Sequence, residues 1–179
     1  MANNGRQNVA RWMLVATIAF VLCGCSPDLG HDKPVAQPIT CVNNLKQIGL
    51  AFKTWALDHG DQYPFNVSTN QGGTIELCRI GMDGFDMNAV HHLQVMYKEL
   101  STPRILVCPK DHSKKPAVGF HALRPENLTY RLVTGTNITD NYPQQQIMVC
   151  PIDGNALYCD GSVTVTNTSE YPSGQLHVP

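Results

Sequence analysis

The chain has 179 residues, of which 15% are charged, and its formal net charge is −1. Its largest Lys/Arg cluster is the pair Lys114-Lys115, so the basic footprint of a DNA- or RNA-binding protein is missing, and we expect no nucleic-acid partner. A chain of this length favours one domain with a modest core.

The first 24 residues have the order of a secretory signal. Arg6 and Arg11 precede an apolar run from Trp12 to Leu22, and positive charge followed by a short apolar segment is typical of signal peptides. The run is shorter than the roughly 20 apolar residues that a membrane-spanning helix needs. The sequence therefore predicts export, with residues 1–24 removed.

The last residues of this segment, Leu22-Cys23-Gly24-Cys25, resemble a bacterial lipobox. The resemblance implies cleavage between Gly24 and Cys25 and a diacylglycerol on the Cys25 thiol, which carries fatty acyl chains such as palmitate. An ordinary cleaved signal or an uncleaved anchor is the alternative. We expect a lipoprotein of the bacterial cell envelope, anchored to the membrane by lipid, with its domain facing the periplasm or the exterior. Ser26 favours the outer over the inner membrane, because aspartate at this position retains enterobacterial lipoproteins at the inner membrane.

Residues 25–39 are predicted to form a flexible tether, because they contain three prolines and a glycine and show no apolar periodicity. The following segment changes to apolar residues at three- and four-residue steps, which predicts an amphipathic helix from Thr40 to His59, ended by Gly60. Its apolar stripe is Val42, Leu45, Ile48, Phe52, Trp55 and Ala56. We expect this stripe to lie in the core.

Later segments predict a second helix and several strands. The helix is expected over Asn88–Leu100, where the apolar residues again follow a helical period. Strands are expected over the following ranges: 104–108, 128–134, 146–150, 156–159 and 162–166. The last two flank Asp160-Gly161, which is typical of a tight β-hairpin turn.

This order of elements predicts an α+β fold, with an N-terminal amphipathic helix packed on a small antiparallel sheet. The domain is expected over residues 40–168 and a frayed tail over residues 169–179.

Five cysteines remain after the signal peptide and the lipidated Cys25 are set aside: Cys41, Cys78, Cys108, Cys150 and Cys159. In an oxidising compartment they are candidates for disulfides, at most two of which can form, and the sequence leaves the pairing open. Simple buried thiols are the alternative. A zinc site is not expected, because there is no C-x-x-C motif and the histidines are scattered.

One acidic loop is a candidate for calcium. Asp83, Asp86 and Asn88 offer oxygen ligands near a glycine, although the spacing is not that of an EF-hand. Capping of the following helix by Asp86 is the favoured interpretation, and no cofactor other than the covalent lipid is expected. No catalytic residues are predicted, because no G-x-S-x-G motif occurs and the histidines next to acids, in Asp58-His59 and Asp111-His112, are only ingredients of a triad.

Three blocks resemble bacterial pseudopilin-like proteins of the kind abundant in planctomycetes and verrucomicrobia, which are related to type II secretion and type IV pilin components. The first block is Cys41-Val42-Asn43-Asn44-Leu45-Lys46-Gln47-Ile48-Gly49-Leu50-Ala51, followed by Tyr63-Pro64. The second is Leu106-Val107-Cys108-Pro109-Lys110-Asp111, and the third is Asn155-Ala156-Leu157-Tyr158-Cys159-Asp160-Gly161-Ser162-Val163. The family's terminal hairpin pairs a histidine with an Asp-Gly after nine intervening residues.

The chain departs from that family in two respects. Cys150 stands where the family has its histidine ahead of Asp160-Gly161, so a thiol replaces the imidazole. The prepilin start, a cleavage motif followed by a long apolar helix, is replaced by the lipobox and the proline-rich segment. Assembly of a filament through such a helix is therefore not expected.

Together these features predict a lipid-anchored envelope protein with a pseudopilin-like head and a non-catalytic, structural or protein-binding role, linked to a secretion or pilus-like system. Its protein partner would be an envelope or secretion-system component. The first alternative is a periplasmic ligand- or calcium-binding module. The second is a hydrolase whose triad forms only in three dimensions.

Overall fold

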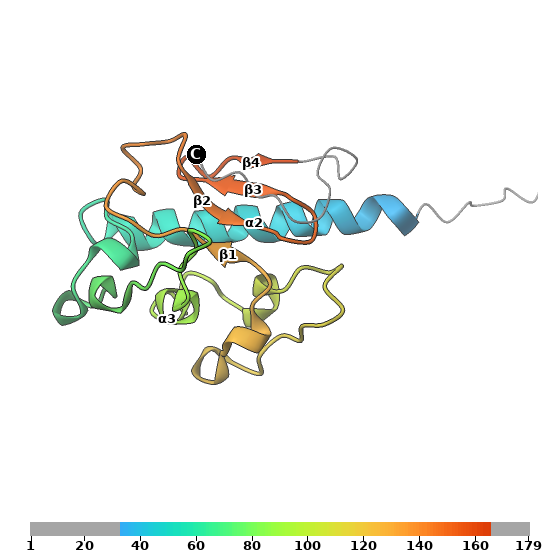
Figure 1. Ribbon diagram of the computed structural model, residues 1–179, viewed down its shortest axis with the longest axis horizontal. Coiled ribbons are helices and arrows are strands. Elements are labelled where there is room, and N and C mark those ends of the chain that lie inside the picture. Colours follow the sequence, from blue (N-terminus) through green and yellow to red (C-terminus); the bar gives the residue numbers. More distant parts are fainter. Residues whose placement is uncertain (1–32, 166–179) are drawn as a thin grey trace, which may run out of the picture. The chain divides into compact units, whose positions relative to one another are not determined.

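The computed structural model describes residues 33–165, with side chains from residue 39 onward. Its fold is α+β, as predicted: one long helix, α2 (Lys33–Leu57), lies against a four-stranded antiparallel sheet (Figure 1). The predicted signal peptide, Cys25 and the tail from residue 169 lie outside the described residues. Among the described residues, no helix combines the length and the apolar character needed to cross a membrane.

Helix α2 begins at Lys33, inside the predicted tether, and it ends at Leu57. Proline density favours an extended chain, but the first four N–H groups of a helix have no intrahelical acceptor, so Pro34 is tolerated in the first turn. Pro38 lies in the second turn, where it lacks the N–H of one helix hydrogen bond. At the other end Gly60 has a φ of 64°, which only glycine adopts readily. The N–H of Asp61 donates to the Ala56 carbonyl and closes this end of the helix.

The predicted apolar stripe of α2 is buried, which confirms the helix and its inner face. Leu45, Ile48 and Phe52 are almost fully inaccessible, and Trp55 is 4% exposed. Val42 is half-buried at the edge of the stripe. Burial of four large apolar side chains is worth about 1.5–3 kcal/mol each relative to exposure, so this face anchors the helix to the rest of the domain.

An aromatic group forms the core beyond the helix. The rings of Phe52, Tyr63 and Phe65 meet edge to face, with centroids 5.4–6.1 Å apart. The Tyr63 hydroxyl lies 2.7 Å from an Asp140 carboxylate oxygen and 2.9 Å from the Cys159 carbonyl. Tyr63 therefore connects the helix to the loop that precedes β2 and to the terminal hairpin.

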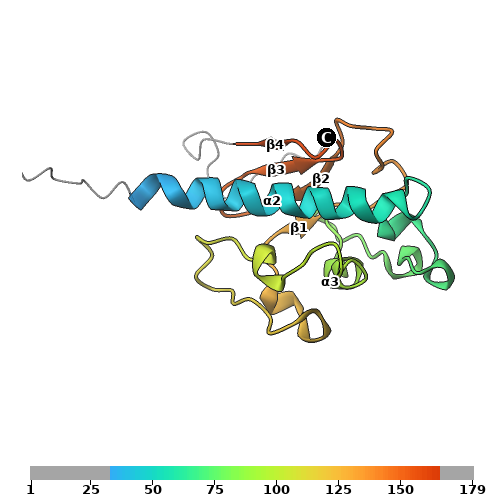
Figure 2. The same ribbon diagram turned by 180° about the vertical axis from the view of Figure 1, so that it is seen from behind.

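The sheet has the strand order β1-β2-β3-β4, with every pair antiparallel. Its strands are β1 (Arg131–Leu132), β2 (Gln146–Val149), β3 (Ala156–Tyr158) and β4 (Val163–Thr164). A register shift interrupts the β2–β3 pair between Gln146 and Met148. Seen from either side, α2 lies across this sheet, and α3 and the turns lie beyond β1 (Figures 1 and 2).

The predicted terminal hairpin is present. Gly161 has a φ of 83°, and the Asp160 side chain accepts the Ser162 N–H. The hairpin comes very close to α2 at Gly49, where an added Cβ would lie 2.7 Å from a Leu157 side-chain carbon. Glycine at position 49 thus permits the close packing of helix on sheet.

The middle of the chain has less regular structure than predicted. The second helix, α3, covers only Ala89–Gln94, and the following residues form turns. Residues 104–108 are not a strand, because Pro103 favours a helical φ and the Thr102 side chain accepts the Arg104 N–H, so 3-10 helix η4 (Pro103–Leu106) forms instead. The other 3-10 helices are η1 (Pro64–Asn66), η2 (Thr69–Gln71), η3 (Ile75–Leu77), η5 (Phe120–Ala122) and η6 (Pro125–Asn127).

Candidate metal centre

Three of the five described cysteines meet in the core with one carboxylate. The ligand atoms of Cys41, Cys108, Cys150 and Asp153 all lie within 4.8 Å of one another, and all four residues are buried. We call this group the thiol cluster. The structure has all five described cysteines as free thiols, and Cys78 and Cys159 lie outside the thiol cluster.

The members of the thiol cluster come from segments far apart in sequence. Cys41 lies on the inner face of α2, Cys108 follows η4, and Cys150 directly follows β2. Asp153 lies in the turn between β2 and β3, which is closed by hydrogen bonds from the Cys150 N–H to the Asn155 carbonyl and from the Gly154 N–H to the Cys150 carbonyl. The fold of helix on sheet is what brings these segments together.

The position of Cys108 is fixed by a hydrogen-bond relay. Its N–H donates to the Thr129 hydroxyl oxygen at 3.2 Å, and that hydroxyl donates to the Asp111 carboxylate at 2.8 Å. The Asn44 amide of α2 donates to the Val107 carbonyl, one residue earlier. Both sides of Cys108 are thus held to neighbouring segments.

Each sulfur has a hydrogen-bond donor directed at it. The Tyr130 hydroxyl lies 3.8 Å from the Cys41 sulfur, and the Asp153 N–H donates to the Cys150 sulfur at 3.4 Å. The Lys110 N–H donates to Cys108, although the neighbouring thiols of Cys150 and Cys41 and burial raise the pKa of Cys108 overall. Hydrogen bonds of this kind favour the charged, thiolate form of cysteine.

A cation compensates the carboxylate. The Lys110 ammonium lies 2.6 Å from one oxygen of Asp153, and the Cys108 thiol lies 3.4 Å from the other. Hydrogen bonding to Asp153 raises the pKa of Lys110 and keeps it charged. The positive charge therefore lies at the edge of a site that can accumulate negative charge.

The thiols titrate as a group. Hydrogen bonds from Cys108 and Cys150 lower the pKa of Cys41 to about 2, whereas donation to its two neighbours raises the pKa of Cys108. The three thiols are therefore close enough to exchange hydrogen bonds with one another. Converging sulfurs beside a carboxylate are the residue types that bind a thiophilic cation.

One buried polar side chain next to the thiol cluster is left unsatisfied. Asn155 is 1% exposed, and neither atom of its amide makes a hydrogen bond of normal geometry among the described residues. It lies near enough to Cys41 to lower the pKa of that thiol. A buried amide without partners costs about 1–3 kcal/mol, so this position requires an explanation.

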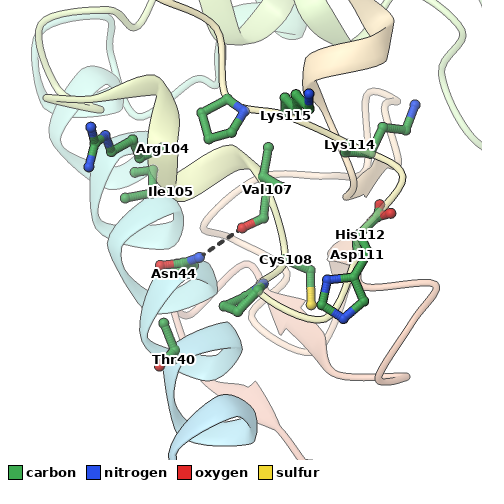
Figure 3. Close-up of a pocket in the computed structure, with 12 residues that line it drawn as sticks. Thr40, Asn44, Arg104, Ile105, Val107, Cys108, Asp111, His112, Lys114 and Lys115 are labelled. Atoms are coloured by element: carbon green, nitrogen blue, oxygen red, sulfur yellow. Dashed lines mark hydrogen bonds between the residues drawn. The ribbon is translucent and has the colours of Figure 1, made fainter.

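A groove of about 510 Å³ lies beside the thiol cluster, between α2 and the segment that follows η4 (Figure 3). Cys108 is one of its lining residues, next to Asn44 and Val107 of the relay described above. The groove also carries basic groups around a single acid, Asp111; these basic residues are Arg104, His112, Lys114 and Lys115. Cys108 lines this groove, although its own side chain is fully buried.

A second group, Cys78, Asp86 and His92, has the residue types of a cysteine hydrolase triad. Their ligand atoms lie within 4.8 Å of one another. The two nitrogens of His92 lie 2.7 Å from the Thr74 hydroxyl and 3.3 Å from an Asp86 oxygen, the latter without the alignment of a hydrogen bond.

This triad lacks the properties of a catalytic site. Burial and the nearby Asp86 charge raise the pKa of the Cys78 thiol, whereas a nucleophilic cysteine needs a lowered one. His92 is fully buried, and burial lowers its pKa, which keeps the imidazole neutral and away from substrate. The group therefore acts in packing rather than in catalysis.

The residues of the predicted calcium loop are engaged with protein groups. Asp83 pairs with Arg131, and the Asn88 amide donates to the Leu77 carbonyl. One Asp86 oxygen accepts the Asn88 N–H and the other accepts the Arg79 N–H. Asp86 thus forms a turn just before α3 rather than a cap on the first turn of that helix. The three side chains of the predicted calcium loop do not direct free oxygen atoms at one shared position.

The sequence did not single out Asp153. Cys108 and Cys150 are each followed by proline, and a backbone N–H two residues later (Lys110) or three residues later (Asp153) reaches the sulfur. That repeated local pattern was the available signal for a shared site. The convergence of these segments on Cys41 depends on tertiary packing, which no local spacing reveals.

No family model, curated protein or solved structure matches this chain. The likeness to pseudopilin-like proteins in the blocks beginning at Cys41, Leu106 and Asn155 therefore stays a prediction.

Proposed function

We propose that this chain is a cell-envelope lipoprotein whose domain is a non-catalytic, pseudopilin-like head that acts through contacts with another envelope or secretion-system protein. The observation that carries this proposal is the order of its parts. A lipobox ending at Cys25 stands directly ahead of one long helix packed on an antiparallel sheet. The lipid would hold the chain at the membrane and leave the head free to bind a partner.

The outer side of α2 supports a role in protein contact. Ile39, Leu50 and Leu57 are exposed, the last to 76%. Their spacings of 11 and 7 residues correspond to nearly whole numbers of helical turns, so the three side chains share one side of the helix. Apolar residues aligned on an exposed helix face are typical of binding surfaces.

The candidate triad argues against the hydrolase alternative. Its histidine is sealed in the core and its thiol is held protonated, as described above. The calcium alternative has no supporting observation either, because Asp83, Asp86 and Asn88 are taken up by protein partners. Neither alternative is proposed here.

The lipid anchor is tested by changing Cys25→Ser in the full precursor. We expect loss of acyl-chain incorporation and loss of partition into detergent, because the thiol is the acylation site. Cys23→Ser is the matched control, since Cys23 occupies a variable position of the lipobox and leaves with the signal. Membrane attachment that persists in Cys25→Ser refutes the lipid anchor.

The binding role is tested in the cells that contain the native partner. Leu50→Glu and Leu57→Glu place charges on the outer face of α2, and we expect each to reduce cross-linking into larger complexes at least about tenfold, at unchanged melting temperature. Val118→Glu is the control, because Val118 is fully exposed outside α2. Equal cross-linking in all three variants would remove this face from the proposal.

A further inference from the structure

We propose that Cys41, Cys108, Cys150 and Asp153 bind one zinc ion in a closed, structural Cys₃Asp site. The inference goes beyond the proposed function and holds whether or not the chain is a lipoprotein. It rests on the convergence of three sulfurs and one carboxylate oxygen in the core of the domain.

The separations fit a tetrahedral ion. Zinc lies about 2.3 Å from thiolate sulfur and about 2.0 Å from carboxylate oxygen, so tetrahedral geometry places a sulfur and an oxygen about 3.5 Å apart and two sulfurs about 3.8 Å apart. The Cys108 sulfur and the Asp153 oxygen are 3.4 Å apart, and no pair in the thiol cluster exceeds 4.8 Å. Small rotations of side chains complete the site.

The donor set selects the metal class. Three soft sulfurs favour zinc over calcium or magnesium, which prefer oxygen ligands. Four protein ligands fill a tetrahedral shell and leave no position open for water or substrate, which is the pattern of structural rather than catalytic zinc. Zinc binding releases the protons of the ligand thiols into solvent, because zinc binds cysteine as thiolate.

The surroundings support a thiolate-rich ion. Three thiolates and one carboxylate carry two more negative charges than zinc can neutralise. The Lys110 ammonium, 2.6 Å from an Asp153 carboxylate oxygen, offsets one of these two charges. Donors from Tyr130, Lys110 and Asp153 are directed at the three sulfurs. Outer groups of this kind orient ligands and tune metal affinity.

Asn155 gains a function in the same site. Its unpartnered, buried amide lies beside Cys41, whose sulfur carries full negative charge when zinc is bound. The amide N–H₂ can then donate to that sulfur, which reduces the cost of burying it.

A disulfide uses this arrangement less fully. A disulfide would join two of the sulfurs and leave the third as a buried thiol. The Asp153 carboxylate and Lys110 would then have no role at the disulfide or at the remaining thiol. Zinc uses all four groups at once. The two states also differ in mass and in metal content, so a single measurement separates them.

The test uses the full mature chain, purified in detergent, stripped of metal with a chelator under reducing conditions and then given zinc alone. We expect native mass spectrometry and elemental analysis to find one zinc per chain, and the Cys41, Cys108 and Cys150 thiols to resist alkylation until the metal is removed. At free zinc about 100 times Kd the melting temperature should rise by about 5–10 °C. Cobalt in place of zinc should give the sulfur-to-metal charge-transfer absorption of a tetrahedral thiolate site.

Variants identify the ligands. Cys108→Ser should abolish stoichiometric zinc, while Cys78→Ser, outside the thiol cluster, should retain one zinc per chain. Because a core cysteine variant can fail to fold, Asp153→Asn provides a second measurement: its shape is conserved, and we expect zinc affinity at least about 10-fold weaker with altered cobalt spectra. Absence of zinc from the wild-type chain, a disulfide that survives in the native cellular environment, or unchanged affinity in Asp153→Asn would each overturn the proposal.

Discussion

Replacing Asp86 by asparagine should destabilise the domain more than any change in the surrounding loop. Asp86 is 6% exposed, and its carboxylate accepts three hydrogen bonds. The N–H groups of Asn88 and Arg79 donate at 2.7 and 3.0 Å, and the Thr134 hydroxyl donates at 2.7 Å. The carboxylate thus joins the start of α3 to the region after β1.

The cost can be worked from these bonds. An asparagine amide has one acceptor oxygen, so at least one backbone N–H loses its partner, at about 1.5–3 kcal/mol for a bond to a charged group. The remaining bonds become neutral and lose about 1 kcal/mol each. Relief from burying a charge offsets part of this sum, which leaves a net loss of about 2–4 kcal/mol.

Urea unfolding measures this loss. With a slope near 2 kcal/mol per molar urea, the unfolding midpoint of Asp86→Asn should fall by about 1–2 M. Asp83→Asn is the matched control, because its pair with Arg131 is exposed and screened by solvent and should contribute much less. Equal midpoints for the two variants would refute the argument from the buried hydrogen bonds.

The pH dependence gives a second readout. Burial raises the pKa of Asp86, but the hydrogen bonds from Thr134, Asn88 and Arg79 outweigh it, and the net pKa is lowered. A carboxyl group with a lowered folded-state pKa contributes stability above its unfolded pKa of about 4, and that stability is lost as the pH falls through the folded-state pKa. The difference between the wild type and Asp86→Asn should therefore shrink on acidification below about pH 4.

Three other measurements follow from the core. Tyr63→Phe removes the hydroxyl that donates to Asp140, and unfolding free energy should fall by about 1–3 kcal/mol in urea titration; an unchanged value would mean that water replaces the bond. Gly73→Ala places a Cβ 2.1 Å from the Val67 carbonyl oxygen, and a loss above about 3 kcal/mol, or failure to fold, is expected in the same assay. Burial lowers the pKa of His92, so stability present above pH 6.5 should decline as the pH falls below 6.5 toward the lowered folded-state pKa, and His92→Gln should flatten this slope; an equal slope in that variant would contradict a neutral, buried imidazole.

The elements that the sequence predicted well are those with a long local pattern. Helix α2 has an apolar stripe from Leu45 to Trp55, so its existence and inner face followed from spacing alone. The terminal hairpin followed from Asp160-Gly161, because few residues adopt positive φ. Both depend on neighbours within a few residues.

The remaining fold depends on contacts that local patterns do not record. A 3-10 helix of three or four residues has no room for a periodic stripe, so η4 was mistaken for a strand. His92 is buried, and its partners Thr74 and Asp86 come from other segments, so its burial could not be read from the spacing within its own helix. The thiol cluster was missed for the same reason, since its parts are assembled by the packing of α2 on the sheet.

The distance along the chain between the members of the thiol cluster bears on when the site can exist. Cys41 and Cys108 are 67 positions apart in the sequence, and Cys150 follows another 42 positions later. Contacts between such distant positions form late and slowly in folding. A chain that crosses a membrane unfolded would not yet contain the thiol cluster. Its metal would then be acquired on the far side of the membrane, after folding. The supply of zinc in that compartment would determine how much of the protein matures.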